Sequence, residues 1–331
     1  MSVLAKTLTA AGAGLFAAAT AFSAPSLAQT RLDGAGATFP APIYERWFKD
    51  LAADGGPQVN YQATGSGTGV KLFTNNDLDF GASDSAMDDA KVARVRRGAV
   101  QIPMTGGAIA VAYNKPGCDL KLSQSQVVDI FMGAITNWRA LGCAPGGITV
   151  AHRSDGSGTT AGFTESLSAF SSVWEEKVGA GKTVEWPVGV GGKGNSGVAG
   201  LIQNKVGTIG YVNYGYVQRP GLQTAALQNK DGNYVQPSAE TAAEGLSQIV
   251  LDDQLRGTDA NPAGENSFPI VSLTWVLAYR TGNGAKLDAL KKTFNYMLSD
   301  EAQSISDSLG YVPLPDSVVA KSKAAVESLG R

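Results

Sequence analysis

The sequence is poor in the side chains from which hydrolases and metal sites are built. It contains one histidine, His152, and two cysteines among 331 residues. A serine nucleophile such as Ser157 needs a base within hydrogen-bonding reach, but His152 lies on a predicted strand with its side chain on the face opposite to Arg153. No spacing of His, Cys or carboxylates matches a metal site. We therefore predict no enzymatic activity, no metal and no cofactor, and we interpret His152 as structural.

Charge and long apolar runs are also scarce. Charged residues make up 17% of the chain, and the formal net charge is −2 at pH 7. This slightly acidic balance gives no support for a nucleic-acid-binding surface. No run of 18 apolar residues occurs beyond the first thirty residues, so we expect no membrane-spanning helix there. A chain of this length and composition predicts two folded domains.

The first 28 residues have the pattern of a secretory signal peptide. Lys6 precedes an apolar stretch of small residues, and Ser26, Leu27 and Ala28 fit the small-x-small cleavage rule. The alternative is a membrane anchor, which needs about 20 strongly apolar residues. This segment is instead mostly alanine and glycine and contains Pro25. We predict an exported protein that is cleaved after Ala28.

The two cysteines, Cys118 and Cys143, are separated by 25 positions. Since an exported protein reaches an oxidising compartment, the pair predicts a disulfide. The alternative is two free buried thiols, which alkylation of the native protein would detect.

Short strand-like runs alternate with helix-period segments along most of the chain, a pattern that predicts an α/β fold. The predicted strands cover residues 59–63, 78–82, 100–103, 108–113, 148–152, 208–212 and 271–279. The predicted helices cover residues 42–51, 69–75, 125–132, 157–170, 195–203, 239–252 and 285–298, with a last pair after residue 300.

Glycine, by contrast, is abundant, with 41 residues that cluster beside Ser, Thr and Asp. Four segments combine a glycine-rich turn with hydroxyl residues and lead into a predicted helix: DGAGATFPAP (33–42), TGSGTGVK (64–71), SDGSGTTAGF (154–163) and GGKGNSGVAG (191–200). The unpaired N–H groups of a helix N-terminus favour a bound anion. For any single segment, a plain N-capped helix is the simpler interpretation. None is a nucleotide P-loop, and GAGATF lacks the third glycine of the dinucleotide fingerprint.

Arg153 stands at the end of a predicted strand, just before the third glycine-rich segment. Its guanidinium could give two parallel hydrogen bonds to an oxyanion, and Asp155 would orient it and offset its charge. A surface ion pair between the two is the alternative. Ser157, Gly158 and Thr159 would add hydroxyl and backbone donors at the helix start.

Asp84 lies within a second unusual stretch, LDFGASDSAMDD (78–89), in which a strand ends in small residues and Asp84 stands in the turn that follows. A carboxylate in a dry anion site repels its ligand unless the ligand carries a proton. The alternative for Asp84 is a helix or turn cap.

These motifs resemble those of the periplasmic phosphate-binding proteins of high-affinity phosphate ABC transporters, the PstS family. The resemblance covers nearly the whole mature chain and rests on GAGATFPAPIYERW, VNYQATGSGTGVK, DFGASDSAM, RSDGSGTTAGFTESL, VEWPVGVGGKGNSGVAGLIQ, GTIGYVNYGYV and YVPLPDSVV. It implies an α/β, two-domain periplasmic binding protein of the type II-like class, with a ligand cleft between lobes joined by two hinge strands. Domain I would comprise residues 29–109 and 274–331, and domain II residues 110–273.

The resemblance also implies a ligand set. Phosphate would be bound by donors from three loops and by one acceptor, Asp84, with Asp155 beside the arginine; the donors would be Ala37, Thr38, Phe39, Ser66, Arg153, Ser157, Gly158 and Thr159. The chain departs from the family pattern at Gly67 and Thr68, where the family has another serine and a glycine. Lys193 and Asn195 are assigned to the rim of the cleft or to a supporting position.

The implied function is to bind inorganic phosphate in the periplasm, as a monomer, and to deliver it to the membrane permease of an ABC transporter. Asp84 would accept the proton that HPO4(2−) and H2PO4(−) carry and that sulfate lacks. The alternatives are a receptor for another tetrahedral oxyanion, a secreted phosphatase that uses Ser157, and a surface adhesin built on the same fold.

Overall fold

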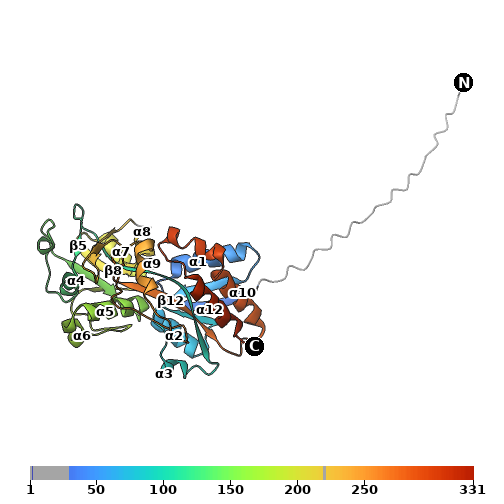
Figure 1. The fold of residues 1–331 in the computed structure, drawn as a ribbon. Helices are drawn as coiled ribbons and strands as arrows, with labels where there is room; N and C mark the ends of the chain where they lie inside the picture. The colour runs from blue at the N-terminus through green and yellow to red at the C-terminus, as the bar shows by residue number, and fades with distance from the viewer. Residues whose placement is uncertain (1, 3–29, 219–220) are drawn as a thin grey trace.

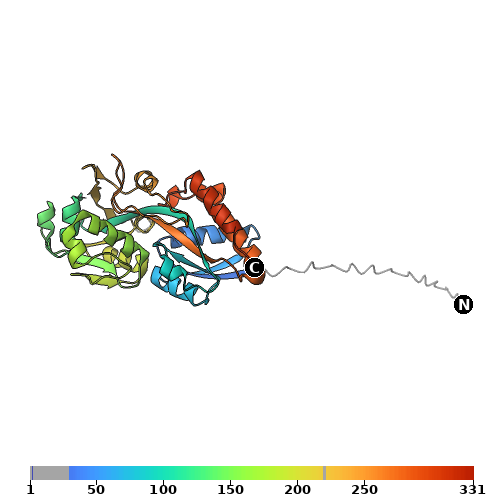
Figure 2. The ribbon, with the colours of Figure 1, turned by 60° about the horizontal axis from the view of Figure 1, so that its bottom comes forward.

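The computed structural model describes residues 2, 30–218 and 221–331. Within this part of the chain, nine strands form one sheet in the order β2-β1-β3-β12-β4-β8-β6-β7, with β9 paired to β4. We call the part built around β1, β2 and β3 the first lobe, and the part built around β6, β7 and β8 the second lobe. The two lobes lie side by side, and strands β4 and β12 run between them (Figure 1, Figure 2).

In the first lobe, β1 pairs in parallel with β2 and β3, and β12 is antiparallel to β3 and β4. The strands are β1 (Arg31–Gly36), β2 (Gln58–Ala63), β3 (Phe80–Ser83), β4 (Ala99–Tyr113) and β12 (Val271–Tyr279). The helices are α1 (Ala41–Ala53), α2 (Ser66–Thr74), α3 (Asp89–Val92), α10 (Leu287–Met297), α11 (Asp300–Ser304) and α12 (Asp316–Glu327), with 3-10 turns η2 (Gly284–Lys286) and η3 (Asp307–Leu309).

In the second lobe, β6 pairs in parallel with β7 and β8, while β4 is antiparallel to β8. The strands are β6 (Thr149–Arg153), β7 (Val190–Gly192), β8 (Thr208–Asn213) and β9 (Gln223–Thr224), with a small separate sheet of β5 (Lys121–Leu122), β10 (Ala226–Gln228) and β11 (Tyr234–Val235). The helices are α4 (Gln124–Phe131), α5 (Gly158–Phe170), α6 (Ser172–Lys177), α7 (Gly194–Asn204), α8 (Gly215–Gln218) and α9 (Ala239–Ser247), with the 3-10 turn η1 (Trp138–Leu141).

Strand β4 connects the lobes. Its first part, up to Ala108, pairs with β12, and its last residues, from Ile109 to Tyr113, pair with β8. The sequence predicts two strands here, residues 100–103 and 108–113, and that prediction is wrong: the backbone stays extended through the residues between them, including Gly106 and Gly107. The glycine allows a close approach, since a Cβ on Gly106 would lie 2.6 Å from Leu246 Cδ1 and that side chain would have to shift.

Six of the described strands have no counterpart among the predicted ranges: β1, β7 and the short strands β5, β9, β10 and β11. β1 has one large apolar side chain, Leu32, and two glycines, so it lacks the usual β-rich composition. Gly34 makes room for Phe80 of β3, because a Cβ at position 34 would lie 2.2 Å from the ring. β12 coincides with its predicted range, and the ranges predicted for β6 and β8 differ from the observed strands by one residue.

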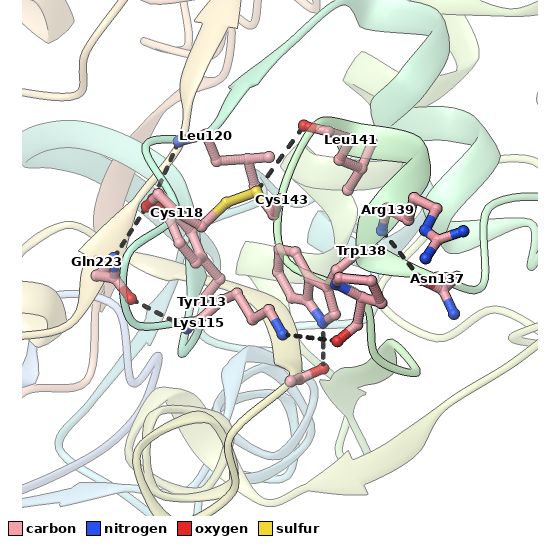
Figure 3. The surroundings of a disulfide bond; sticks show 12 residues. Tyr113, Lys115, Cys118, Leu120, Asn137, Trp138, Arg139, Leu141, Cys143 and Gln223 are labelled. Atoms are coloured by element: carbon pink, nitrogen blue, oxygen red, sulfur yellow. Dashed lines mark hydrogen bonds between the residues drawn. A yellow bond between two sulfur atoms is a disulfide. The ribbon is translucent and has the colours of Figure 1, made fainter.

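The predicted disulfide between Cys118 and Cys143 is confirmed, with the two Cα atoms 5.4 Å apart (Figure 3). The bond ties the loop after β4 to the turn after η1. Tyr113 supports the first cysteine, because its hydroxyl donates to the Cys118 carbonyl (2.8 Å) and accepts from the N–H of Leu120 (3.1 Å).

In the described residues no helix is long and apolar enough to cross a membrane. The predicted signal peptide, residues 1–28, lies outside the described residues apart from Ser2, so the structure does not bear on it.

Candidate functional site

Loops from both lobes meet at one place, at the carboxyl ends of β1, β3 and β6. The chain leaves β1 at Ala37, leaves β3 at Asp84 and leaves β6 at Ser154, and helices α2, α5 and α7 begin beside these loops. The edge beyond the carboxyl ends of parallel strands is the usual place for a ligand in such folds. Helix N-termini make the same place favourable for an anion.

Three tyrosine hydroxyls hold the loop of residues 37–39 from outside. They donate 2.6 Å hydrogen bonds to three successive carbonyl groups: Tyr61 to Ala37, Tyr216 to Thr38 and Tyr311 to Phe39. No partner among the described residues engages the N–H groups of Thr38 and Phe39. These two N–H groups are therefore available as ligand donors.

Ala37 differs from the two residues that follow it. Its N–H donates to the carbonyl of Ala82 at 3.0 Å, across the first-lobe sheet. The N–H of Ala37 is therefore already used within the protein, and the assignment of Ala37 to the ligand set stays a prediction that this N–H does not support. The sequence does not show which N–H groups of the loop complete the sheet.

Asn195, at the start of α7, joins the lobes inside the site. Its Nδ2 donates to Thr38 Oγ1 (2.9 Å) and to Thr159 Oγ1 (3.1 Å), while its Oδ1 accepts from the N–H of Asn213 (2.8 Å). Thr38 Oγ1 also accepts from the N–H of Asn195 (3.1 Å), and Thr159 Oγ1 accepts from Arg153 Nη1 (3.4 Å). Since each threonine oxygen already accepts two hydrogen bonds, its own proton is left to donate.

Asn195 is fully buried, so it does not lie on a rim. Its hydrogen bonds to Thr38 and Thr159 are those of a supporting position, the other assignment made from the fourth glycine-rich segment.

Arg153 and Asp155 form a bidentate ion pair that is almost fully buried. Arg153 Nε donates to Asp155 Oδ1 at 2.7 Å and Nη2 donates to Oδ2 at 2.5 Å, as the sequence predicts. Burial opposes the charge of Asp155, but the hydrogen bonds and charge of Arg153 outweigh it, so the pKa of Asp155 is lowered. The side chain of Arg153 is only 1% exposed, which excludes the alternative of a surface ion pair.

Asp84 is a buried acceptor, and it faces the second lobe. Its Oδ1 accepts from Thr274 Oγ1 (2.8 Å), and its Oδ2 lies 3.4 Å from Ser66 Oγ. Burial raises the pKa of Asp84 to about 7, against the lowering effects of Thr274 and of the charges of Arg153 and Lys182. Thr274 lies on β12, 190 positions further along the chain, and no local motif points to it.

The N-terminus of α5 forms the second-lobe wall of the site. Ser157 caps the helix, because its Oγ accepts from the N–H of Thr160 at 2.9 Å and its own proton remains available. Among the described residues no partner engages the N–H groups of Gly158 and Thr159. A Cβ at Gly158 would lie 2.6 Å from Ser66 Oγ and 2.7 Å from Asp84 Cβ, so the lobes meet here at backbone distance.

The loop between Gly65 and Gly67 makes a matching contact on the other side. The N–H of Gly67 donates to the carbonyl of Gly156 at 2.8 Å. Gly65 has φ +97°, and a Cβ there would lie 2.3 Å from Asp155 Oδ2. The lobes are therefore in direct contact around the site, with Ser66, Asp84 and Arg153 buried between them.

His152 is engaged elsewhere, which agrees with its structural interpretation. Its ring stacks on Trp186 at a centroid distance of 5.0 Å, and Nδ1 lies 3.0 Å from the carbonyl of Arg153. Ser157 takes its hydrogen bond from Thr160, not from this ring.

Comparison with known proteins agrees with this geometry. A family model described as a PBP superfamily domain matches residues 23–301. The chain is 38% identical over 319 residues to the phosphate-binding protein PstS of Pasteurella multocida, with 92% of this chain and 91% of that protein covered. It is 34% identical over 321 residues to the phosphate-binding protein PstS of Methanocaldococcus jannaschii, with 86% and 82% covered.

Solved structures share the fold at lower identity. A phosphate-binding protein from Stenotrophomonas maltophilia has a TM-score of 0.71 at 21% identity, with 89% of this chain and 94% of that chain covered. An ABC-type phosphate transport receptor from Vibrio cholerae has a TM-score of 0.57 at 18% identity, with 86% and 100% covered. The two-lobed, type II-like binding-protein fold is thereby confirmed.

Proposed function

Since the chain belongs to the PstS family of phosphate-binding proteins, we propose that it binds inorganic phosphate between its lobes and delivers it to the permease of a phosphate ABC transporter. The observation that carries the proposal is the hydrogen-bonding state of two buried threonine hydroxyls in the site, those of Thr38 and Thr159. The hydroxyls of Thr38 and Thr159 each accept two hydrogen bonds from the protein, so they present protons to the cleft. An anion is the ligand that such donors suit.

The proposed ligand donors are the N–H groups and hydroxyls of three loops, together with the guanidinium of Arg153 and the hydroxyl of Ser66. The loop donors come from Thr38, Phe39, Ser157, Gly158 and Thr159. Arg153 is oriented by Asp155, which also reduces its net attraction for the ligand. Ala37 contributes its backbone to the loop and no donor.

Asp84 is the proposed source of selectivity. It is the acceptor in a site of donors, so it needs a ligand that brings a proton. HPO4(2−) and H2PO4(−) both carry one, whereas sulfate at neutral pH would set a lone pair against the carboxylate.

For the lobes, we propose the boundaries of the family fold, with domain I at residues 29–109 and 274–331 and domain II at 110–273. Two observations support them: β4 changes partner from β12 to β8 at Ile109, and β12 shows a register shift between Thr274 and Trp275. Phosphate would bridge the lobes and stabilise their contact over an open form, by a hinge motion about these strands.

The remaining parts of the proposal are export, a monomeric state and the absence of catalysis. Export through the segment 1–28 would place the protein in the periplasm, where a disulfide such as Cys118–Cys143 persists. The engagement of His152 with Trp186 leaves Ser157 without an evident base, which disfavours a phosphatase.

The test is calorimetry of the protein, freed of phosphate, with phosphate and with sulfate at neutral pH. We expect tight phosphate binding and sulfate binding weaker by several orders of magnitude. Comparable affinities would overturn the role of Asp84 and favour a general oxyanion receptor. Turnover of a chromogenic phosphate ester that disappears in Ser157→Ala would overturn the assignment as a transport receptor.

A further inference from the structure

Lys182 is a cation of the second lobe that reaches into the first. It lies between α6 and β7, and its Nζ lies 3.2 Å from Ser83 Oγ and 3.3 Å from the carbonyl of Ser85. Its own carbonyl accepts the N–H of Ser157 at 2.8 Å. One residue therefore contacts the helix cap of one wall of the site and the turn that carries Asp84 on the other.

The turn that receives Lys182 is prepared for a cation. Ser83 Oγ donates to the Ser85 carbonyl (2.6 Å) and accepts from the Ser85 N–H (3.2 Å), so its remaining lone pair faces outward. The ammonium completes this turn on both oxygens. Asp84 lies between the two serines, so the same contact holds the turn whose backbone carries the acceptor carboxylate.

The charges around Asp84 also favour a role for Lys182 at this turn. Arg153 is paired with Asp155, which offsets much of its charge, so the ionised form of Asp84 is stabilised by a second nearby cation. Arg153 and Lys182 both lower the pKa of Asp84, so both act on it electrostatically. On its first-lobe side, Lys182 is also influenced by Lys91 and Asp88 at α3, which act with opposite signs. Burial lowers the pKa of Lys182 to about 8, so it stays mostly protonated at neutral pH.

We propose that Lys182 is a positioning residue that latches the lobes over bound phosphate, with its ammonium docked on the turn from Ser83 to Ser85. The inference rests on the proposed phosphate function and adds a residue outside the ligand set. Because the contact joins the lobes, it exists when they are together and is lost when they part. Lys182 therefore slows the escape of phosphate more than it speeds its arrival.

The experiment compares wild type with Lys182→Met, using inorganic phosphate in stopped-flow and calorimetric measurements. We expect the dissociation rate to rise about tenfold, as for one lost charge-assisted hydrogen bond, with the association rate changed by less than about threefold. Lys177→Met removes an exposed cation of α6 and is expected to change neither rate. An unchanged dissociation rate in Lys182→Met, or an equal change in Lys177→Met, would overturn the latch.

A second variant, Ser83→Ala, tests the docking itself. It removes one of the two acceptors, so Lys182→Met should cost clearly less in the Ser83→Ala background than in wild type. Fully additive effects would overturn docking on the turn. The two proposals fail differently: a wild type that does not bind phosphate defeats the proposed function, whereas a wild type that binds it and a Lys182→Met variant with wild-type kinetics defeat the latch alone.

Discussion

Asn195 determines which way two hydroxyl groups of the cleft direct their protons. The side-chain amide of Asn195 donates to the hydroxyl oxygens of Thr38 and Thr159 and so helps to occupy their lone pairs. Each hydroxyl can then only donate its proton to a ligand. The same amide is held in one orientation, because its oxygen accepts the N–H of Asn213. Asn195, although uncharged, thus orients both hydroxyls so that they can donate hydrogen bonds to an anion.

Asn195→Asp should reverse this effect with almost no change in shape. The carboxylate would accept the two hydroxyl protons and add a negative charge beside the anion, so phosphate affinity should fall by about 100-fold or more. Calorimetry measures the loss. Asn204→Asp, at the exposed end of the same helix, is the matched control and should bind phosphate like wild type. Equal affinity in both variants would contradict the polarity argument.

Asp84 also predicts a pH-dependent stability difference. Burial raises its pKa from the ordinary value of 3.8 to about 7 in the folded protein, so folding favours the protonated carboxyl. The stability that this group contributes is fully present below about pH 4 and is lost as the pH rises through about 7. Without phosphate, Asp84→Asn should therefore match wild type at pH 4 and exceed it at pH 8 by on the order of 4 kcal/mol.

Urea denaturation at the two pH values measures this difference. An equal effect of Asp84→Asn at pH 4 and pH 8 would show that burial does not raise the pKa of the carboxyl.

Residue-scale prediction from the sequence succeeds where partners are close along the chain. Arg153 and Asp155 are two positions apart, and their ion pair follows from the local motif. Asn195 and Thr38 are 157 positions apart, and Thr274 and Asp84 are 190 apart. These contacts depend on the tertiary structure. Residues that orient other side chains of the site, such as Asn195 and Thr274, are therefore harder to predict than the proposed ligand-binding residues themselves.

At the scale of elements, the start of α5 depends on the absence of one methyl group. Gly158→Ala would place a Cβ against Ser66 and Asp84, so the lobes could not reach their observed contact. Phosphate affinity should fall by about 100-fold or more, while phosphate-free stability should hold or rise slightly, since alanine favours helix. Gly200→Ala in α7 has open space for its Cβ and serves as control. Calorimetry and thermal unfolding separate the two effects.

Element boundaries follow the sequence where packing and local pattern agree. β12 has nine consecutive buried residues and was predicted to its ends. The sequence predicts two strands where β4 is continuous, and Gly106, which lies between the two predicted ranges, allows the close approach of Leu246. The sequence also fails to predict β1, where Gly34 has no side chain and the ring of Phe80 occupies the space that a Cβ would take. In both cases a neighbouring large side chain explains the small residue, and the sequence alone does not identify that neighbour.

For the whole molecule, the disulfide should contribute stability without affecting the ligand. A closed loop of 25 positions predicts about 3 kcal/mol from the lost entropy of the unfolded chain. Replacing Cys118 and Cys143 together by serine should lower the free energy of unfolding by about that amount and leave phosphate affinity unchanged. Chemical denaturation and calorimetry are the measurements. A large loss of affinity would show that the bond supports the cleft.

The place of β12 in the sheet has a consequence for the order in which the protein can fold. It lies between β3 and β4 in the first lobe, although its residues follow the whole second lobe in the chain. During synthesis β1 and β3 leave the ribosome first, but the first-lobe sheet cannot be completed until β12 has been synthesised, late in the chain. A nascent chain that stops before Val271 carries Thr38, Asp84 and Arg153 but lacks Thr274, the partner of Asp84. The site is thus assembled only when synthesis is almost complete.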